Sequence, residues 1–194
     1  MVRVFLRGVW SVVSGRGWWL GFLNWVFFGS VVVGGLLAQA GFVTFSWWPF
    51  GEASSLELGN AFLLFGVIFV FNLVLSGFVF VTLSGLVFFV LSPILLGFRA
   101  LLWGVLLNGL STSRFVAALP TVVLEGEGYV LAGLAGLLLG LSWLKPEWAY
   151  RGEALTRSQA LKRALKDSVY IYVLVVVFLV LAALVETLTI ALST

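Results

Sequence analysis

The sequence predicts an all-α polytopic membrane helix bundle, with about five transmembrane helices, an N-terminal interfacial helix and a cytoplasmic amphipathic helix. Of the 194 residues, 62% are hydrophobic and only 10% are charged, whereas a soluble domain has about 45–50% apolar and about 25% charged residues. The mean hydropathy is +1.17. A soluble fold of this length could not bury so much apolar surface. The lipid bilayer must therefore be the main solvent of the chain.

Residues 1–17 alternate apolar side chains with Arg3, Arg7 and Arg16, a pattern typical of a helix that lies in the membrane interface. The same basic start resembles a secretory signal, with small residues before a cleavage point near Ala40. The apolar stretch 18–40 is, however, far longer than the hydrophobic region of a signal peptide, which has about 7–15 residues. We therefore interpret it as a retained first transmembrane helix.

Four further apolar stretches reach the length of about 20 residues that a span needs; they cover 58–82, 85–110, 119–144 and 169–192. The second and third are nearly continuous. The break lies either at 82–85 or, in the alternative, after one long helix that ends at Ser92, with a short helix following Pro93. We expect a single integral membrane domain over 1–194, in which 18–144 hold four spans and 145–168 form a basic segment before the last.

The distribution of charge predicts the orientation. The segment 145–168 contains six basic and three acidic residues, and the loop 41–56 contains only Glu52. Because cytoplasmic loops carry an excess of Lys and Arg, we expect the N-terminus and 145–168 in the cytoplasm of a multi-pass cell-membrane protein. This topology accounts for the net charge of +3 without nucleic acid as a partner. Tryptophan pairs lie at the predicted interfaces, where indoles are favoured: Trp18 and Trp19, Trp47 and Trp48, Trp143 and Trp148.

The basic segment contains a predicted helix start, because Thr156 and Gln159 have the spacing of a capping box. An apolar stripe of Ala154, Ser158, Leu161 and Leu165 then recurs at helical spacing. The cytoplasmic basic surface comprises Arg157, Lys162, Arg163 and Lys166. The pattern predicts an amphipathic elbow that either anchors at the membrane surface or docks a cytoplasmic partner.

The composition also excludes several kinds of chemistry. The chain has no histidine and no cysteine, which removes Ser-His-Asp and Cys-His catalysis, thiolate metal sites and disulfides. We expect no cofactor, no metal and no enzymatic activity; an intramembrane hydrolase is the weakest alternative, because no nucleophile has a partner base. The scarcity of thermolabile residues suggests a thermophilic source.

Ionisable side chains inside spans are costly and mark a polar interior. The predicted intramembrane polar cluster comprises Arg99, Glu125, Glu127 and Glu186. On the predicted spans Arg99, Glu125 and Glu186 lie about 3, 9 and 7 Å outward of their helix centres, in the same half of the bilayer, while Glu127 points to nearly the opposite face of its helix. Three interpretations stay open. The cluster could be a structural link that sets the registry of the helices. It could be a site for a proton, an ion or a lipid headgroup, or a carboxylate metal site.

Glycines and small residues suggest close helix contacts. Gly126 and Gly128 flank Glu127 and predict either an interrupted helix, as in transporters, or a helix that starts at Pro120. The close-packing face of Ala132, Gly136 and Gly140, and a second of Ser30, Gly34 and Ala38, allow helices to approach within the chain or in a homodimer. Asn72 and Asn108 are predicted to make interhelical hydrogen bonds.

Several of these residues together resemble the stage II sporulation protein M family. The segment LPTVVLE at 119–125 is similar to the family's Leu-Pro-His-Gly-x-x-Glu entry, and the Ala/Gly-rich 131–140 follows it as in the family. Asn72, the Asn108-Gly109 pair, the basic helix 157–166 and LVET at 184–187 fit other landmarks, over about residues 60–190. The chain departs at Thr121 and Val122, where the family has His-Gly, so no role of that histidine carries over.

The resemblance implies a multi-span membrane protein in which Glu125 and Glu186 match family positions. In spore formers it implies a scaffold that acts with peptidoglycan-degrading partners, and some relatives look similar to permease subunits of ATP-driven transporters. We therefore expect a non-enzymatic scaffold or subunit of a membrane complex, with a membrane or cytoplasmic protein partner. A transporter or permease-like subunit that handles a proton, an ion or a lipid-like substrate at the Arg/Glu cluster is the alternative.

Overall fold

The computed structural model describes residues 2–43 and 61–193, and throughout these ranges the regular structure is helical, without a strand. Five helices are long and apolar enough to cross a membrane: Gly17–Gln39, Ala61–Val87, Leu91–Asn108, Thr112–Leu144 and Arg157–Ala191. The predicted all-α polytopic bundle and its five spans are therefore confirmed. Trp47, Trp48 and most of the 41–56 loop lie outside the described residues.

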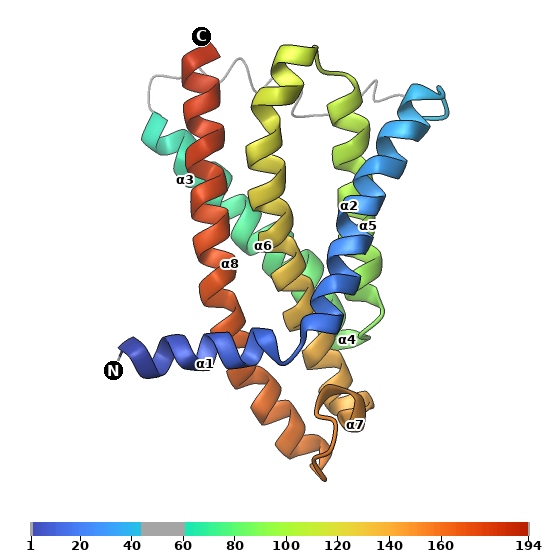
Figure 1. Ribbon diagram of the computed structural model, residues 1–194, viewed down its shortest axis with the longest axis vertical. Helices are drawn as coiled ribbons and strands as arrows, with labels where there is room; N and C mark the ends of the chain where they lie inside the picture. Colours follow the sequence, from blue (N-terminus) through green and yellow to red (C-terminus); the bar gives the residue numbers. More distant parts are fainter. Residues whose placement is uncertain (1, 44–60, 194) are drawn as a thin grey trace.

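The N-terminal helix α1 (Val2–Ser14) lies across one end of the bundle, at a steep angle to α2 (Gly17–Gln39), as Figure 1 shows. The chain turns between them at Gly15 and Arg16, whose backbone N–H groups still donate to the carbonyls of Ser11 and Val13. This is the arrangement expected of an interfacial helix followed by a span. We call this end of the bundle the α1 end.

The second span is built from three consecutive pieces: α3 (Ala61–Val70), η2 (Phe71–Leu83) and α4 (Ser84–Val87). The middle piece is a π-helix, in which hydrogen bonds join residues i and i+5. Its buried residues, Asn72, Ser76, Gly77, Val81 and Thr82, accordingly recur at every fourth or fifth position. This π-helix is not apparent from the sequence, because π-helices are rare. Where they do occur, they are often found at functional sites.

Both predicted boundaries between the second and third spans are wrong. The helix continues through Gly85 to Val87, Phe88 is extended (φ −151°, ψ 120°), and α5 (Leu91–Asn108) begins before Pro93. Pro93 is the third residue of α5, where no intrahelical N–H is needed, so it does not break the helix.

Helix α6 (Thr112–Leu144) runs through the centre of the molecule and contacts α2, η2, α5 and α8 (Figure 1). It begins after Ser111, well before the predicted start at Pro120, which lies inside the helix. The predicted interruption at 124–128 is also wrong, since the helix is continuous there. Gly126 and Gly128 instead make room for neighbouring side chains: a Cβ on them would lie 2.6 Å from the Phe27 ring and 2.8 Å from Leu179.

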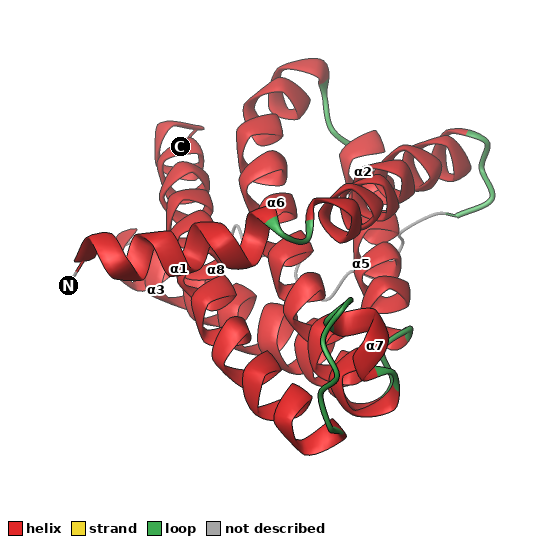
Figure 2. Ribbon diagram, turned by 60° about the horizontal axis from the view of Figure 1, so that its bottom comes forward, coloured by secondary structure: helices red, strands yellow, loops and turns green. Residues whose placement is uncertain are grey.

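The short α7 (Pro146–Ala149) precedes α8 (Arg157–Ser193), and both extend beyond α1 at the α1 end (Figures 1 and 2). The capping box is confirmed: the Thr156 N–H donates to Gln159 Oε1 at 3.0 Å, and the Gln159 N–H donates to Thr156 Oγ1 at 3.4 Å. Helix α8 is continuous from Arg157 through the last span, so no break separates the predicted elbow from the span, and Figure 1 shows α8 changing direction where α1 crosses it.

The predicted stripe on this segment is not the side that the protein itself buries. Ser158 and Leu165 are exposed, whereas the buried positions are Ala160 and Ala164, which pack with Leu139 and Tyr150. Two small residues are buried because the end of α6 and the loop after α7 cover this side of α8.

Two helix pairs, α2 with α5 and α6 with α8, make the most extensive contacts. The largest fully buried side chains are Tyr129, Phe27, Leu23, Leu96 and Leu134.

The close-packing face of Ala132, Gly136 and Gly140 contacts η2, α4 and the start of α5 within the chain. The Thr82 hydroxyl donates to the Ala132 carbonyl at 2.8 Å, and a Cβ on Gly140 would lie 2.1 Å from the Gly85 carbonyl oxygen. The glycines therefore bring α4 and α6 into backbone contact.

Candidate functional site

The structure brings Arg99 and Glu125 together with Asn72, from three different helices. Asn72 of η2 lies between the other two: its Nδ2 donates to Glu125 Oε1, and its Oδ1 accepts a hydrogen bond of 3.3 Å from Arg99 Nη2. Asn72 and Glu125 are 6% and 1% exposed. One amide thus joins an arginine of α5 to a carboxyl group of α6 in the interior of the bundle.

Tyr129 completes this arrangement and was not a predicted site residue. Arg99 Nη2 donates to the Tyr129 hydroxyl at 2.5 Å, and the guanidinium carbon lies 4.3 Å from the centre of the Tyr129 ring, a cation–π geometry. Ser76 of η2 is buried and lies close enough to the Tyr129 hydroxyl to interact with it. A signal for Tyr129 existed in the sequence: it follows Glu125 by four residues and therefore shares its helix face.

The two remaining acids of the predicted cluster lie differently. Glu186 of α8 is half-buried and lies close enough to Arg99 and Glu125 for their charges to interact. Glu127 faces Asn24 of α2 instead, as its position two residues from Glu125 requires. The cluster that the structure assembles is therefore Arg99, Asn72, Glu125 and Tyr129, with Glu186 at its edge.

Hydrogen bonding in the cluster is incomplete. Arg99 Nε and Glu125 Oε2 are buried and have no hydrogen-bond partner. Arg99 and Ser76 also line a groove of about 260 Å³ between η2 and α5. The site therefore combines the charged guanidinium group of Arg99, the Glu125 carboxyl group with one oxygen that has no hydrogen-bond partner in the described ranges, and the groove beside Arg99.

The third interpretation of the cluster, a carboxylate metal site, finds no support in the described part of the chain, where no group of three acidic side chains is placed to hold a metal ion. Asn108 does not lie between helices: it is the exposed last residue of α5. The prediction of an interhelical role for Asn108 is therefore wrong, whereas Asn72 does link two helices.

A second polar network lies at the α1 end, and the sequence analysis did not predict it. Arg16 Nη2 and Asp167 Oδ2 are 2.5 Å apart, with side chains 12% and 11% exposed, so α8 holds the turn between α1 and α2. The Tyr150 hydroxyl donates to Asp167 at 3.1 Å. Burial, and secondarily the charge of Asp167, raise the pKa of Tyr150 above its ordinary value.

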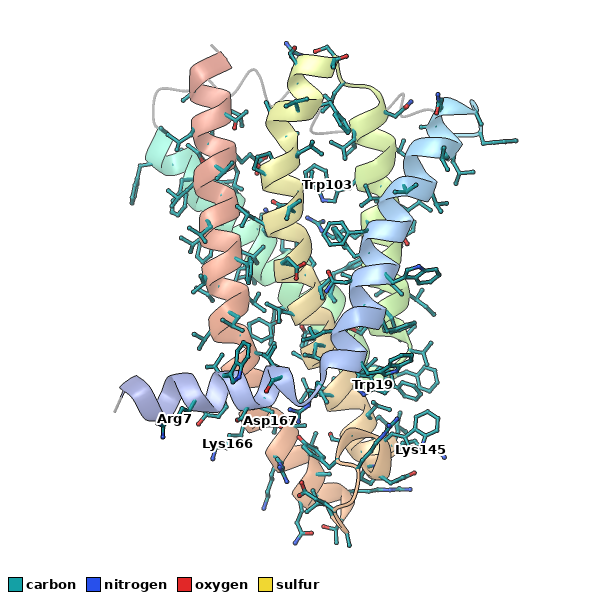
Figure 3. The ribbon with its side chains drawn as sticks, in the orientation of Figure 1. Arg7, Trp19, Trp103, Lys145, Lys166 and Asp167 are labelled. Atoms are coloured by element: carbon teal, nitrogen blue, oxygen red, sulfur yellow. The ribbon has the colours of Figure 1, made fainter. Side chains whose placement is uncertain are left out.

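The basic surface surrounds this network. Arg163 pairs with Glu153 and lies over the Tyr150 ring, 4.7 Å from its centre. Arg157, Lys162 and Lys166 are exposed. Figure 3 shows Arg7 of α1 near Lys166 and Asp167, where α1 crosses α8. Asp167 and Glu153 are paired within the protein, and Arg157, Lys162 and Lys166 remain at the surface.

Comparison with known proteins agrees with this architecture. Residues 49–189 match the family described as Stage II sporulation protein M. No curated protein and no solved structure is significantly similar to the chain. The match covers more than half of the chain, including every residue of the Arg99 cluster and most of α8, so this multi-pass membrane protein belongs to the stage II sporulation protein M family.

Proposed function

We propose that this protein is a non-enzymatic scaffold or subunit of a membrane complex, and that it recruits its partner through the basic α1 end on the cytoplasmic side. The supporting observation is that two acidic side chains of this end are paired within the protein, whereas three basic side chains have no such pair in the part of the chain that the structure describes. Asp167 and Glu153 are each paired with an arginine of the protein itself. Arg157, Lys162 and Lys166 are exposed without an acid within ion-pair distance among the described residues.

Such a surface is suited to an acidic partner. Charge complementarity steers association and selects partners more than it adds affinity. Glu147 is the remaining exposed acid at this end, so the unpaired charge is strongly positive. The positive-inside rule supports a cytoplasmic location for it.

The interior supports a structural role for the polar cluster. Arg99 and Asn72 connect η2, α5 and α6, and polar links between spans hold helices in one register. In this proposal the cluster sets the shape of the scaffold, and the α1 end does the recruiting.

Site-specific photo-crosslinking in native cells tests the proposal. A crosslinking residue at position 165, exposed between Lys162 and Lys166, should capture one protein in fixed stoichiometry; the same residue at lipid-facing position 181 should not. Reversing both lysines to glutamate should abolish that product. The matched control is Arg114→Glu, an exposed charge reversal in the first turn of α6. Crosslinks to lipid alone, or a product that survives the reversal of both lysines, would contradict the proposal.

Transport is the second candidate function, and the free Glu125 Oε2 atom favours it. A carboxyl oxygen without a partner can take a proton or an ion, and intramembrane acids often form such relays. In proteoliposomes, Glu125→Gln and Glu186→Gln should then abolish flux while thermal stability stays near the wild-type value. Glu153→Gln, an exposed acid outside the spans, is the control. Lowered thermal stability with unchanged flux per folded protein would favour the structural role instead.

A further inference from the structure

The groove between η2 and α5 opens on the lipid-facing side of the bundle. Its apolar lining comes from both helices: Phe71, Leu75, Phe80, Phe98 and Leu102. Four of these are large hydrophobic side chains with exposed surface, which in this protein faces acyl chains. Ser76 and Arg99 are the polar residues of the lining. The groove is therefore amphipathic, with an apolar wall and one positively charged point.

Arg99 has more hydrogen-bond donors than the protein uses. A guanidinium group carries five N–H donors and stays charged in proteins. Both hydrogen bonds of Arg99 come from Nη2, and Nε is buried without an acceptor. In the described ranges no carboxylate lies within ion-pair distance of it. Glu125 and Glu186 lie near enough for their charges to act on Arg99, but neither bonds it, and an acceptor in the groove would complete its hydrogen bonding.

We propose that this groove binds a long-chain carboxylic acid from the bilayer, with the carboxylate held by Arg99 and Ser76 and the chain lying against the apolar wall. A carboxylate matches the guanidinium fork in shape and charge. The volume of about 260 Å³ lies just below the range of about 300–1,000 Å³ typical of pockets for drug-sized ligands. The groove therefore has room for a head and part of one chain.

Depth in the membrane favours the same ligand. Arg99 is the ninth of the 18 residues of α5, so it lies near the middle of the span. A phospholipid keeps its headgroup at the surface, because an ionised group costs too much free energy in hydrocarbon. A monocarboxylic acid can cross hydrocarbon in its neutral form and reach this depth. Binding at Arg99 goes beyond the scaffold role and does not depend on it.

Photolabelling of the purified protein in nanodiscs tests the proposal. The probe is a palmitic acid that carries a diazirine in its chain, and mass spectrometry maps the labelled peptides. We expect labelling in residues 71–80 and 98–102. Laurate should compete with the probe, whereas dodecanol, which has a chain of equal length but no charge, should compete at least about tenfold less well, as loss of a charge-assisted hydrogen bond implies.

Two variants separate binding from folding. Arg99→Gln removes the charge and should abolish site-selective labelling. Because Arg99 also bonds Asn72 and Tyr129, Leu102→Trp provides a second variant that keeps the cluster and fills the groove. Its matched control is Leu181→Trp, the same change on the lipid-facing side of α8, which should leave labelling unchanged.

Three results would overturn the proposal. The first is that dodecanol competes with the probe as well as laurate does, and the second is a label that spreads evenly over the lipid-facing helices. The third is labelling that persists in a folded Leu102→Trp protein. Partner crosslinking at position 165 is a separate measurement, so failure of the carboxylate site and failure of the scaffold proposal can be told apart.

Discussion

Replacing Gly104 with alanine should destabilise the protein strongly, because α2 and α5 touch through their backbones at this residue. A Cβ on Gly104 would lie 1.9 Å from the Val31 carbonyl oxygen and 2.7 Å from the Gly35 nitrogen. The contact is reciprocal: a Cβ on Gly34 would lie 2.1 Å from the Leu101 carbonyl oxygen. The obstacles are backbone atoms, which cannot rotate away as a side chain can.

The size of the effect follows from these distances. Restoring ordinary contact, at 3.4 Å or more, requires the helices to separate by roughly 1.5 Å at this point. Overpacking in a rigid interior costs about 1–3 kcal/mol and sometimes more, and the separation also loses dispersion contacts along the interface. Alanine recovers about 1 kcal/mol of helix propensity relative to glycine. Because backbone atoms cannot move aside, the overpacking cost lies at the upper end, about 3 kcal/mol, and we expect a net loss of about 2 kcal/mol in the free energy of unfolding.

Gly29→Ala is the matched control on α2, because a Cβ at Gly29 meets nothing within 4 Å. It should be neutral or stabilise by up to about 1 kcal/mol. The assay is equilibrium unfolding in mixed detergent micelles, followed by helical circular dichroism, for both variants and the wild type. Equal free energies of unfolding for Gly104→Ala and Gly29→Ala would refute the backbone contact between α2 and α5.

Three further predictions concern the α1 end. Asp167→Asn leaves Arg16 partly buried without its charge partner and should lower the free energy of unfolding by about 3 kcal/mol, whereas Glu153→Gln, which breaks an exposed pair, should cost under about 1 kcal/mol; equal losses in thermal melts would contradict this difference. Thr156→Ala removes the capping side chain of α8 and should cost about 1 kcal/mol, seen as faster amide hydrogen exchange in the first turn of α8 and nowhere else. Because the pKa of Tyr150 is raised, the native state keeps its proton where the unfolded state loses it, so stability should fall as the pH rises above about 10; melts between pH 9 and 11 should show a smaller fall for Tyr150→Phe, and an identical fall would count against the buried phenol.

The sequence predicts the span count well because each span depends on its own composition. A run of about 20 apolar residues partitions into lipid whichever neighbours it has, and the five helices appear where such runs lie. The capping box at Thr156 is equally local, since its two hydrogen bonds join residues three apart. Charge spacing on α6 similarly predicted that Glu125 and Glu127 face different helices.

Helix boundaries were predicted less well, because neighbouring helices decide them. The second span continues past Gly85, which contacts the backbone of α6 at Gly136, and Pro93 is accommodated in the first turn of α5. Helix α8 begins at Arg157, well before the predicted span, and its first turns pack against the end of α6 and Tyr150 through Ala160 and Ala164. None of these contacts is encoded in the local pattern.

By itself, the sequence determined that this chain is a five-span helical membrane protein, where its spans lie along the chain, and which of its few charges lie inside them. Only the tertiary structure decided which polar groups meet: Asn72 between Arg99 and Glu125, Tyr129 beside Arg99, and Arg16 with Asp167. The physical reason is that partition into lipid is a property of each segment. The pairing of buried polar groups instead depends on the relative rotation and height of helices far apart in the chain.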